Sequence, residues 1–297
     1  MPNLEAKDLL LLALAGFTIF YLARLWAAVG AQRAESAQRP APNVPGLATG
    51  FVTNFFDTLG IGSFATTTAI WRQWKMVPDE RIPGTLNVGH TLPAIVQAFI
   101  FIRLVPVDPL TLFLMIGAAI TGSFLGATVV SGWPRRRIQF GMGGALLAAA
   151  ILLLFGQLNI APAGGELLAL TGTKLVIAVA ANLLLGALMT LGIGLYGPCM
   201  IVIYLLGMNP LAAFPIMMGS CAFLMPVASA RFMKARRIDL SAALGLLVGG
   251  LPAVVIAAFI VKSLPLYWIR WLVFVVVVYT AVGMLRAGLK EKTVAAG

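Results

Sequence analysis

The sequence TLGIG occurs twice in the chain, at positions 58–62 and 190–194. A Gly-x-Gly turn leaves backbone N–H groups uncovered and lets the chain approach a ligand closely. If a helix begins directly after each turn, its first amides and the positive end of its dipole point at the same place. Helix starts of this kind bind anions. The repeated motif therefore predicts an anion site built from two loop tips, without a charged side chain.

Small polar side chains follow both turns and complete the predicted site. Hydroxyl groups donate hydrogen bonds to an oxyanion without adding a full charge. The residues that we predict to bind the anion are Gly60, Gly62, Ser63, Thr66, Thr67, Gly192, Gly194, Tyr196, Gly197 and Cys199. Two alternatives stay open: membrane glycines often serve helix packing, and hydroxyl groups often bond the backbone carbonyl one turn earlier.

Asp57 lies one residue before the first turn, and an intramembrane carboxylate is a functional candidate by default. An ionised Asp57 would repel an anion, so we predict that it is protonated or carries protons. A hydrogen bond that closes the turn is an equal alternative. His90 is the only histidine and can exchange a proton near neutral pH, although a packing role fits as well. The residues predicted to line the cavity are Asn54, Asn87, Gln97 and Asn182.

The composition places the chain in a membrane. Of its 297 residues, 60% are hydrophobic and only 10% are charged, whereas soluble domains carry about 25% charged residues. The net charge of +11 is therefore interpreted as a topology signal, and we expect no nucleic-acid partner. The two cysteines, Cys199 and Cys221, lack metal-ligand spacing. We expect no metal, no other cofactor and no catalytic residue.

Apolar stretches of about 19–23 residues predict crossing helices, because this length spans a hydrocarbon core of ~30 Å. They lie at 8–30, 84–102, 110–131, 138–156, 210–230, 240–261 and 266–285. The first stretch does not follow a basic leader, so residues 1–30 are predicted to form an N-terminal anchor helix. Residues 31–45 are polar and proline-rich and predict a linker.

Two further segments, 46–74 and 175–207, are too long for one span, and each contains TLGIG near its middle. Division at the glycines leaves halves of about 12–17 residues, or ~18–25 Å of helix. These lengths favour re-entrant hairpins, with pairs of short crossings as the alternative. Either arrangement puts sixteen of the 21 Lys and Arg residues on one face and five on the other, as the positive-inside rule requires.

The predicted fold is an all-α polytopic membrane protein with two inverted repeats. Each repeat has one broken or re-entrant helix hairpin and three transmembrane helices, and one extra helix precedes them. The repeats are assigned to 46–156 and 175–287, with a loop at 157–174 and a tail at 288–297. We expect the basic loops and the C-terminus to be cytoplasmic and the N-terminus to be periplasmic.

The chain resembles the sulfite exporter TauE/SafE family, also called the 4-toluenesulfonate uptake permeases. The resemblance is carried by GFVTNFFDTLGIGSFATTT from Gly50 and by IPGTLNVGHTLP from Ile82. We expect it to cover 46–285 and to exclude the first helix. It implies transport of sulfite or organosulfonates across the bacterial inner membrane. Ser63 and Phe64 replace the glycine run that is usual in the family, whereas the second half keeps Gly197 and Pro198.

The leading hypothesis is a secondary transporter that moves a small sulfur-containing oxyanion by alternating access. Proton coupling through Asp57 or His90 stays open, as do the direction of transport and a homodimeric state. An anion channel is the second hypothesis. An intramembrane hydrolase with Ser63 as nucleophile and His90 as base is a remote third, because the second motif has Leu195 at the position equivalent to Ser63.

Overall fold

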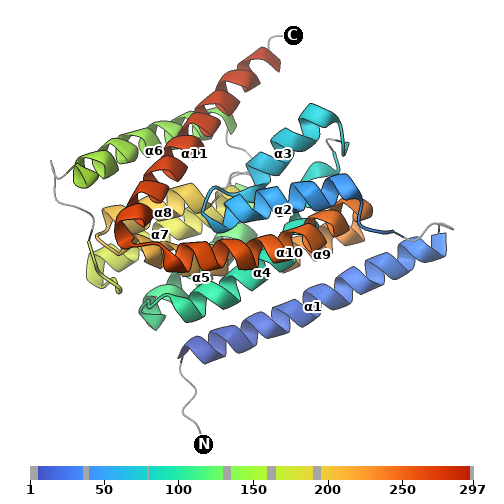
Figure 1. The fold of residues 1–297 in the computed structure, drawn as a ribbon, viewed down its shortest axis with the longest axis horizontal. Helices are drawn as coiled ribbons and strands as arrows, with labels where there is room; N and C mark the ends of the chain where they lie inside the picture. The colour runs from blue at the N-terminus through green and yellow to red at the C-terminus, as the bar shows by residue number, and fades with distance from the viewer. Residues whose placement is uncertain are drawn as a thin grey trace, which may run out of the picture. The chain divides into compact units, whose positions relative to one another are not determined.

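The computed structural model describes residues 6–35, 40–78, 80–129, 135–158, 165–189 and 195–294. Eleven α-helices and one 3₁₀ helix lie within these residues (Figure 1). They are α1 (Ala6–Glu35), α2 (Val44–Thr58), α3 (Ser63–Trp74), α4 (Ile82–Leu104), α5 (Pro109–Val129), α6 (Arg135–Gln157), α7 (Gly172–Met189), α8 (Tyr196–Leu205), η1 (Pro210–Ala212), α9 (Ala213–Lys234), α10 (Leu240–Ser263) and α11 (Leu266–Val294).

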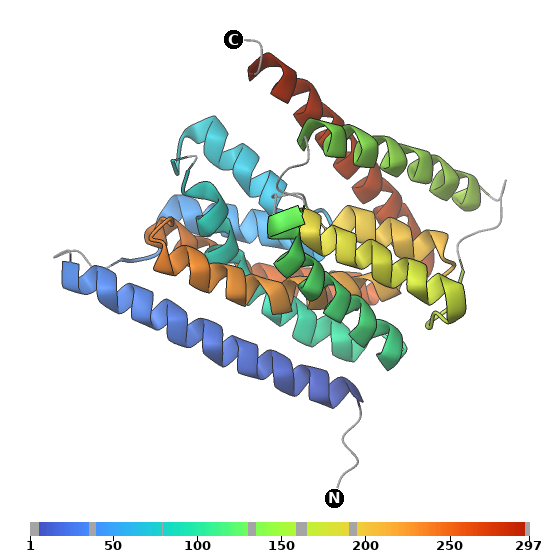
Figure 2. The ribbon, with the colours of Figure 1, turned by 180° about the vertical axis from the view of Figure 1, so that it is seen from behind.

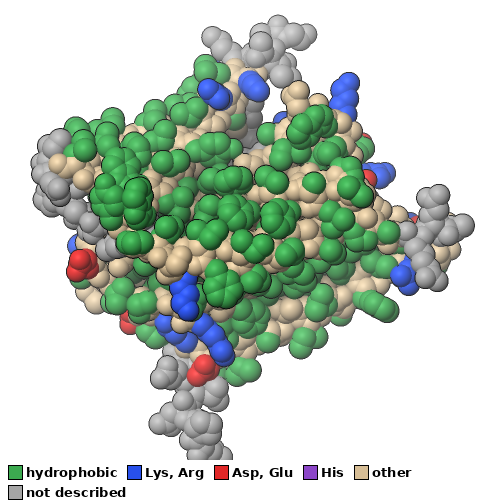
Figure 3. All heavy atoms as spheres, in the orientation of Figure 1, with side chains coloured by type: hydrophobic (Ala, Val, Ile, Leu, Met, Phe, Trp, Pro, Cys, Tyr) green, Lys and Arg blue, Asp and Glu red, His purple; other side chains and the backbone are tan. Residues whose placement is uncertain are grey.

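Six of these helices are long and apolar enough to cross a bilayer. The six stretches are Lys7–Glu35, Ile82–Leu104, Gly172–Met189, Pro210–Lys234, Leu240–Ser263 and Trp271–Lys290. Hydrophobic side chains cover most of the face seen in Figure 3, as expected for a protein surrounded by lipid. The prediction of an all-helical polytopic membrane protein is confirmed.

Of the two over-long segments, the first is broken where the sequence predicts a break. In the first, α2 ends at Thr58, and Gly60 and Gly62 have positive φ angles of 100° and 85°, which only glycine adopts without strain. The halves α2, α3 and α8 have 15, 12 and 10 residues. With 18 residues, α7 is longer than predicted and long enough to cross. The second turn, 190–194, lies outside the described residues.

The chain divides into two compact units. One consists of residues 1–104 and 218–262, and the other of 105–217 and 263–297. Each unit combines helices from both predicted repeats. The boundaries predicted for the repeats themselves stay a prediction.

In the first unit, α2 packs closely against α10 through small residues. A Cβ atom added at Gly50 would lie 2.5 Å from the carbonyl oxygen of Leu246, and one added at Gly250 would meet the side chain of Asn54. Small residues at such contacts let two membrane helices approach closely. In the same unit, α4 packs against α9, where the hydroxyl groups of Thr91 and Ser229 lie 2.9 Å apart.

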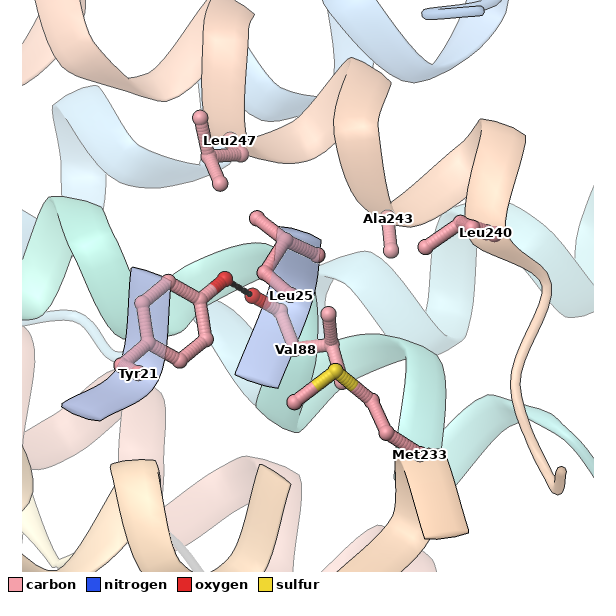
Figure 4. Packing of buried hydrophobic residues seen from close by; sticks show 7 residues of the cluster. All are labelled: Tyr21, Leu25, Val88, Met233, Leu240, Ala243 and Leu247. Carbon is pink, nitrogen blue, oxygen red and sulfur yellow. Dashed lines mark hydrogen bonds between the residues drawn. The ribbon is translucent and has the colours of Figure 1, made fainter. Parts of the chain in front are cut away.

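The first helix belongs to the first unit. Tyr21 donates its hydroxyl proton to the carbonyl oxygen of Val88 at 2.6 Å, in a cluster of buried apolar residues (Figure 4). At the end of α1, both carboxylate oxygens of Glu35 bind the guanidinium of Arg236 at 2.6 and 2.8 Å. Helix α1 thus continues to Glu35, five residues past residue 30, where the sequence predicts its end.

In the second unit, α5 packs against α7, and α6 against α11. Asn182 donates from Nδ2 to the carbonyl oxygen of Met115 at 2.6 Å. Helices α6 and α11 lie side by side in both ribbon views (Figures 1 and 2). They are antiparallel, because the start of α6 contacts the end of α11 and the end of α6 contacts the start of α11. The two contacts are Arg136 with Gly288 and Gln157 with Tyr267.

Candidate functional site

Helix α2 buries a polar face around the first break. Its buried residues include Thr53, Asn54, Asp57 and Thr58, whereas the apolar Phe56 is 42% exposed. This pattern is inverted relative to a soluble helix and fits a helix that faces lipid with its apolar side. Polar side chains that a membrane helix turns inward are candidates for a functional site.

The turn between α2 and α3 is closed by the backbone and by Asp57. The Asp57 carbonyl oxygen accepts the Gly60 N–H at 2.8 Å, and its carboxylate Oδ1 accepts the Ser63 N–H at 2.6 Å. Ser63 is the first residue of α3, so this amide has no partner within its own helix. The structural hydrogen bond that was one interpretation of Asp57 is therefore present.

Gln97 holds the second carboxylate oxygen. Its Nε2 atom donates to Asp57 Oδ2 at 2.9 Å and to Thr58 Oγ1 at 2.8 Å. The Thr58 hydroxyl donates a hydrogen bond to the Asn54 carbonyl oxygen at 2.8 Å. Its Oγ1 atom can therefore only accept from Gln97. The hydrogen-bond network therefore fixes the orientation of the Gln97 amide.

His90 bridges α2 and α3 from its place on α4. Its Nδ1 atom lies 3.0 Å from Asn54 Oδ1, and its Nε2 atom lies 3.0 Å from Thr67 Oγ1. Asn54 uses Nδ2 to donate to the Gly50 carbonyl oxygen, so its Oδ1 accepts a hydrogen bond from the His90 Nδ1–H. His90 Nε2 then accepts from the Thr67 hydroxyl. Every polar atom of the ring has a partner.

This arrangement does not form the pair that a hydrolase with Ser63 as nucleophile requires. The ring of His90 contacts Asn54 and Thr67 instead of Ser63. A hydroxyl, an imidazole and an amide in series are reminiscent of a catalytic triad. However, Thr67, His90 and Asn54 are only 0%, 1% and 0% exposed, so a substrate carbonyl has no access to the Thr67 hydroxyl in this conformation.

The structure brings many of the predicted site residues together in the first unit. The residues that lie in the turn or in the hydrogen-bond network around it are Asn54, Asp57, Gly60, Gly62, Ser63, Thr67, His90 and Gln97. Among the described residues, no heavy atom lies within 4 Å of the position that a Cβ on Gly62 would take. The start of α3 is thus approachable at Gly62.

Two other predicted residues of the first unit make local hydrogen bonds to backbone carbonyls. Thr66 Oγ1 bonds the backbone carbonyls of Gly62 and Ser63 at 3.1 and 2.9 Å, which is the alternative interpretation of its role. Asn87 is partly exposed and donates to the Pro83 carbonyl oxygen at 2.9 Å. It does not join the described network.

The remaining predicted residues belong to the second unit. Tyr196, Gly197 and Cys199 are buried in α8, and Gly197 packs against Thr280. Asn182 binds the backbone of α5 through Met115. Gly192 and Gly194 lie outside the described residues. A role of these residues in substrate binding stays a prediction.

Thr58 is a member of the hydrogen-bond network that sequence reasoning missed. It joins Gln97 to the backbone of α2. A signal for it was present, because Thr58 is the first residue of the repeated TLGIG.

These observations define a polytopic membrane protein with a broken helix and a buried polar network at the break, which is an arrangement typical of membrane transporters. The family model described as sulfite exporter TauE/SafE matches residues 3–153. This is just over half of the 297 residues, and the chain belongs to this family. No curated protein and no solved structure matches the chain.

The matched range corrects one expectation. It begins at residue 3 and so includes α1, which we expected to lie outside the resemblance. Its inclusion is consistent with the packing of α1, because Tyr21 and Leu25 are buried against the same unit as the polar network. The match ends within α6, so the resemblance of the second half stays a prediction.

Proposed function

We propose that the protein is a secondary transporter that moves sulfite or a small organosulfonate anion across the bacterial inner membrane by alternating access. Membership of the sulfite exporter TauE/SafE family is the observation that carries this proposal. The start of α3 supports it, because Gly62 leaves the chain open to a ligand there. The first amides and the dipole of a helix stabilise a negative charge at such a position.

The polar network suits transient binding of an anion. Its members on α2, α3 and α4 are amides, hydroxyls, one imidazole and one carboxylate, without Lys or Arg among them. An oxyanion would be held by N–H and O–H donors and by the helix dipole. Such binding is weak enough to permit release. Asp57 and His90 are the titratable groups of this network, so a proton is the coupling ion that the proposal includes.

The helix packing supports two repeats of equivalent structure. If residues of α2 and α7 are related by the offset of 132 between the TLGIG motifs, Gly50 corresponds to Asn182 and Asn54 to Gly186. In the first unit, Gly50 packs on Leu246 and Asn54 on Gly250. In the second unit, Asn182 packs on Met115 and Gly186 on Ala119. The partners on α10 are Leu246 and Gly250, and those on α5 are Met115 and Ala119. The difference in residue number between equivalent partners is the same for both pairs.

The direction of packing supports inversion of the second repeat. Helices α4 and α9 are the third elements of the two repeats, and α6 and α11 are the fifth. Each pair is antiparallel: Gly84 and Thr91 on α4 meet Phe232 and Ser229 on α9 in reverse order. A two-fold axis in the membrane plane can pack a helix antiparallel against the equivalent helix of the other repeat. The proposal therefore keeps the inverted arrangement, with the basic loops on the cytoplasmic side.

Thermal unfolding of the purified protein in detergent tests the substrate class. The panel contains sulfite, methanesulfonate, a larger organosulfonate, sulfate and acetate. A ligand at 100 times its dissociation constant stabilises a protein by about 2.7 kcal/mol, so binding raises the melting temperature measurably. Stabilisation by sulfite or sulfonates alone supports the proposal. The proposal is contradicted if no anion of the panel stabilises the protein, or if acetate and sulfate stabilise it as much as sulfite and the sulfonates do.

Counterflow in proteoliposomes separates a transporter from a channel. Vesicles are loaded with unlabelled ligand and diluted into labelled ligand. A carrier that alternates between two faces gives transient accumulation of label above its equilibrium level, whereas a channel gives simple equilibration. The variant Ser63→Ala tests the remote hydrolase at the same time, because it removes the nucleophile and leaves the Ser63 N–H to Asp57 in place.

A further inference from the structure

Asp57 already holds a negative group where α3 begins. Its Oδ1 atom accepts the Ser63 N–H at 2.6 Å, and the residue is 5% exposed. A carboxylate against the first amide of a helix is an anion bound at a helix start. The side chain of Asp57 therefore occupies one of the positions that an incoming oxyanion needs.

We propose that Asp57 is the resident anion of this site and that the transported anion replaces it at the start of α3 only when Asp57 takes up a proton. This inference rests on the proposed function, because it assumes that an anion binds beside Gly62 and Ser63. It assigns to Asp57 the control of occupancy, in addition to closure of the turn.

The surroundings of Asp57 make simultaneous binding of two anions unfavourable. The helix α2 carries no other ionisable residue. On the helices packed around it, the ionisable residues are Arg72 in the last turn of α3, His90 and Arg103 on α4, and Lys262 in the last turn of α10. Only His90 belongs to the network, and both of its nitrogens are engaged. Because like charges in a low-dielectric interior repel strongly, one of the two anions must be neutralised.

Gln97 determines which oxygen of Asp57 receives the proton. Its Nε2 atom keeps donating to Oδ2, whereas the arriving anion takes the Ser63 N–H that Oδ1 accepts, so in this exchange the proton binds to Oδ1. An Oδ1–H group no longer needs the Ser63 N–H and becomes a donor itself. The Asp57 Oδ1–H and the Ser63 N–H then both donate hydrogen bonds to the anion. One proton enters from water with each anion and returns to water when the anion leaves, and no covalent bond of the substrate changes.

Binding of methanesulfonate to the full-length protein in detergent tests this exchange. Methanesulfonate is the anion of a strong acid and keeps its charge over the whole pH range used. Titration calorimetry at about pH 5.5 and about pH 8 compares the wild type with Asp57→Asn. We expect the wild type to bind at least about tenfold more tightly at the lower pH. The Asp57→Asn variant is expected to bind with the same affinity at both values.

Asp108→Asn is a matched control. Asp108 Oδ2 accepts the Thr111 N–H at 2.8 Å at the start of α5, so this carboxylate also closes a helix start but lies in the other unit. The variant is expected to keep the pH dependence of the wild type. A second measurement needs no variant: addition of methanesulfonate to wild-type protein in weak buffer should consume about one proton for each anion bound.

The outcomes separate the inference from the proposed function. Binding by the wild type that is independent of pH, or pH dependence that persists in Asp57→Asn, overturns the role of Asp57 and leaves the transporter proposal intact. Binding of neither methanesulfonate nor sulfite to wild type at either pH overturns the proposed function, and the inference fails with it. If Asp57→Asn does not fold, the proton count of the wild type decides: a count near zero overturns the inference.

Discussion

Gln97 on α4 and Asp57 on α2 are joined by a hydrogen bond of 2.9 Å between Nε2 and Oδ2, although 40 residues separate them in the chain. The same Nε2 atom reaches Thr58 at 2.8 Å. One buried amide therefore ties the last turn of α2 to the middle of α4 and fixes the rotamer of the carboxylate. The geometry of the first turn depends on a residue outside the TLGIG motif.

Replacement of Gln97 by Leu is expected to lower stability. It leaves a buried carboxylate oxygen without its Gln97 donor, and the loss of one partner of a buried hydrogen bond costs about 1–3 kcal/mol. The matched control is Gln73→Leu, since Gln73 is exposed on α3. Thermal unfolding in detergent measures both. Equal melting temperatures for the two variants would contradict a structural role of the Gln97 amide.

A double-mutant cycle tests the polarity of the same contact. Asp57→Asn alone is expected to destabilise the protein, because the single amide oxygen of Asn can accept from only one of the Ser63 N–H and Gln97 Nε2, and its NH₂ group opposes the other donor. Adding Gln97→Glu restores an acceptor opposite that donor. The double variant should therefore be more stable than Asp57→Asn by about 1 kcal/mol. A double variant that is less stable than either single variant would show that the two side chains do not interact as described.

Some ends of the crossing helices were predictable from the sequence, whereas α1, α9 and α11 end five, four and nine residues beyond their predicted ends. Charged residues and prolines end the apolar stretches, so the predicted 240–261 became Leu240–Ser263 and 84–102 became Ile82–Leu104. The start of α2 at Val44 follows from local chemistry too, because Asn43 accepts the Gly46 N–H at 2.7 Å and Pro45 occupies the first turn. The polar and proline-rich composition of the predicted linker 31–45 placed this start two residues late.

The partners of the polar residues were not predictable in the same way. Asn54 and Asp57 share a helix, so their spacing indicates a common face. The contact of His90 with Thr67, in contrast, joins residues on separate helices, and one sequence holds no information on which faces of α3 and α4 meet. For this reason the sequence identified most members of the network as candidates, whereas the membership of Thr58 and the hydrogen bond from Gln97 to Asp57 required coordinates.

Gly50→Ala is expected to weaken the contact between α2 and α10. The added methyl group would lie 2.5 Å from the Leu246 carbonyl oxygen, so the helices must separate, and overpacking of this kind costs about 1–3 kcal/mol. Gly117→Ala on α5 is the control, because no described heavy atom lies within 4 Å of its added Cβ. That change raises helix propensity by about 1 kcal/mol, so it should not lower the melting temperature. Similar losses in both variants would contradict the packing.

The two polar contacts that hold α1 should differ in strength. Tyr21 is fully buried, so Tyr21→Phe removes a buried hydrogen bond to Val88 and is expected to cost about 0.5–1.5 kcal/mol. The side chains of Arg236 and Glu35 are 71% and 54% exposed, and exposed ion pairs contribute about 0–1 kcal/mol because water and salt screen them. Arg236→Gln should therefore have the smaller effect, and its effect should vanish in high salt. Thermal unfolding at low and high salt measures both variants. A larger loss from Arg236→Gln would mean that the ion pair, and not the buried hydroxyl, anchors the first helix.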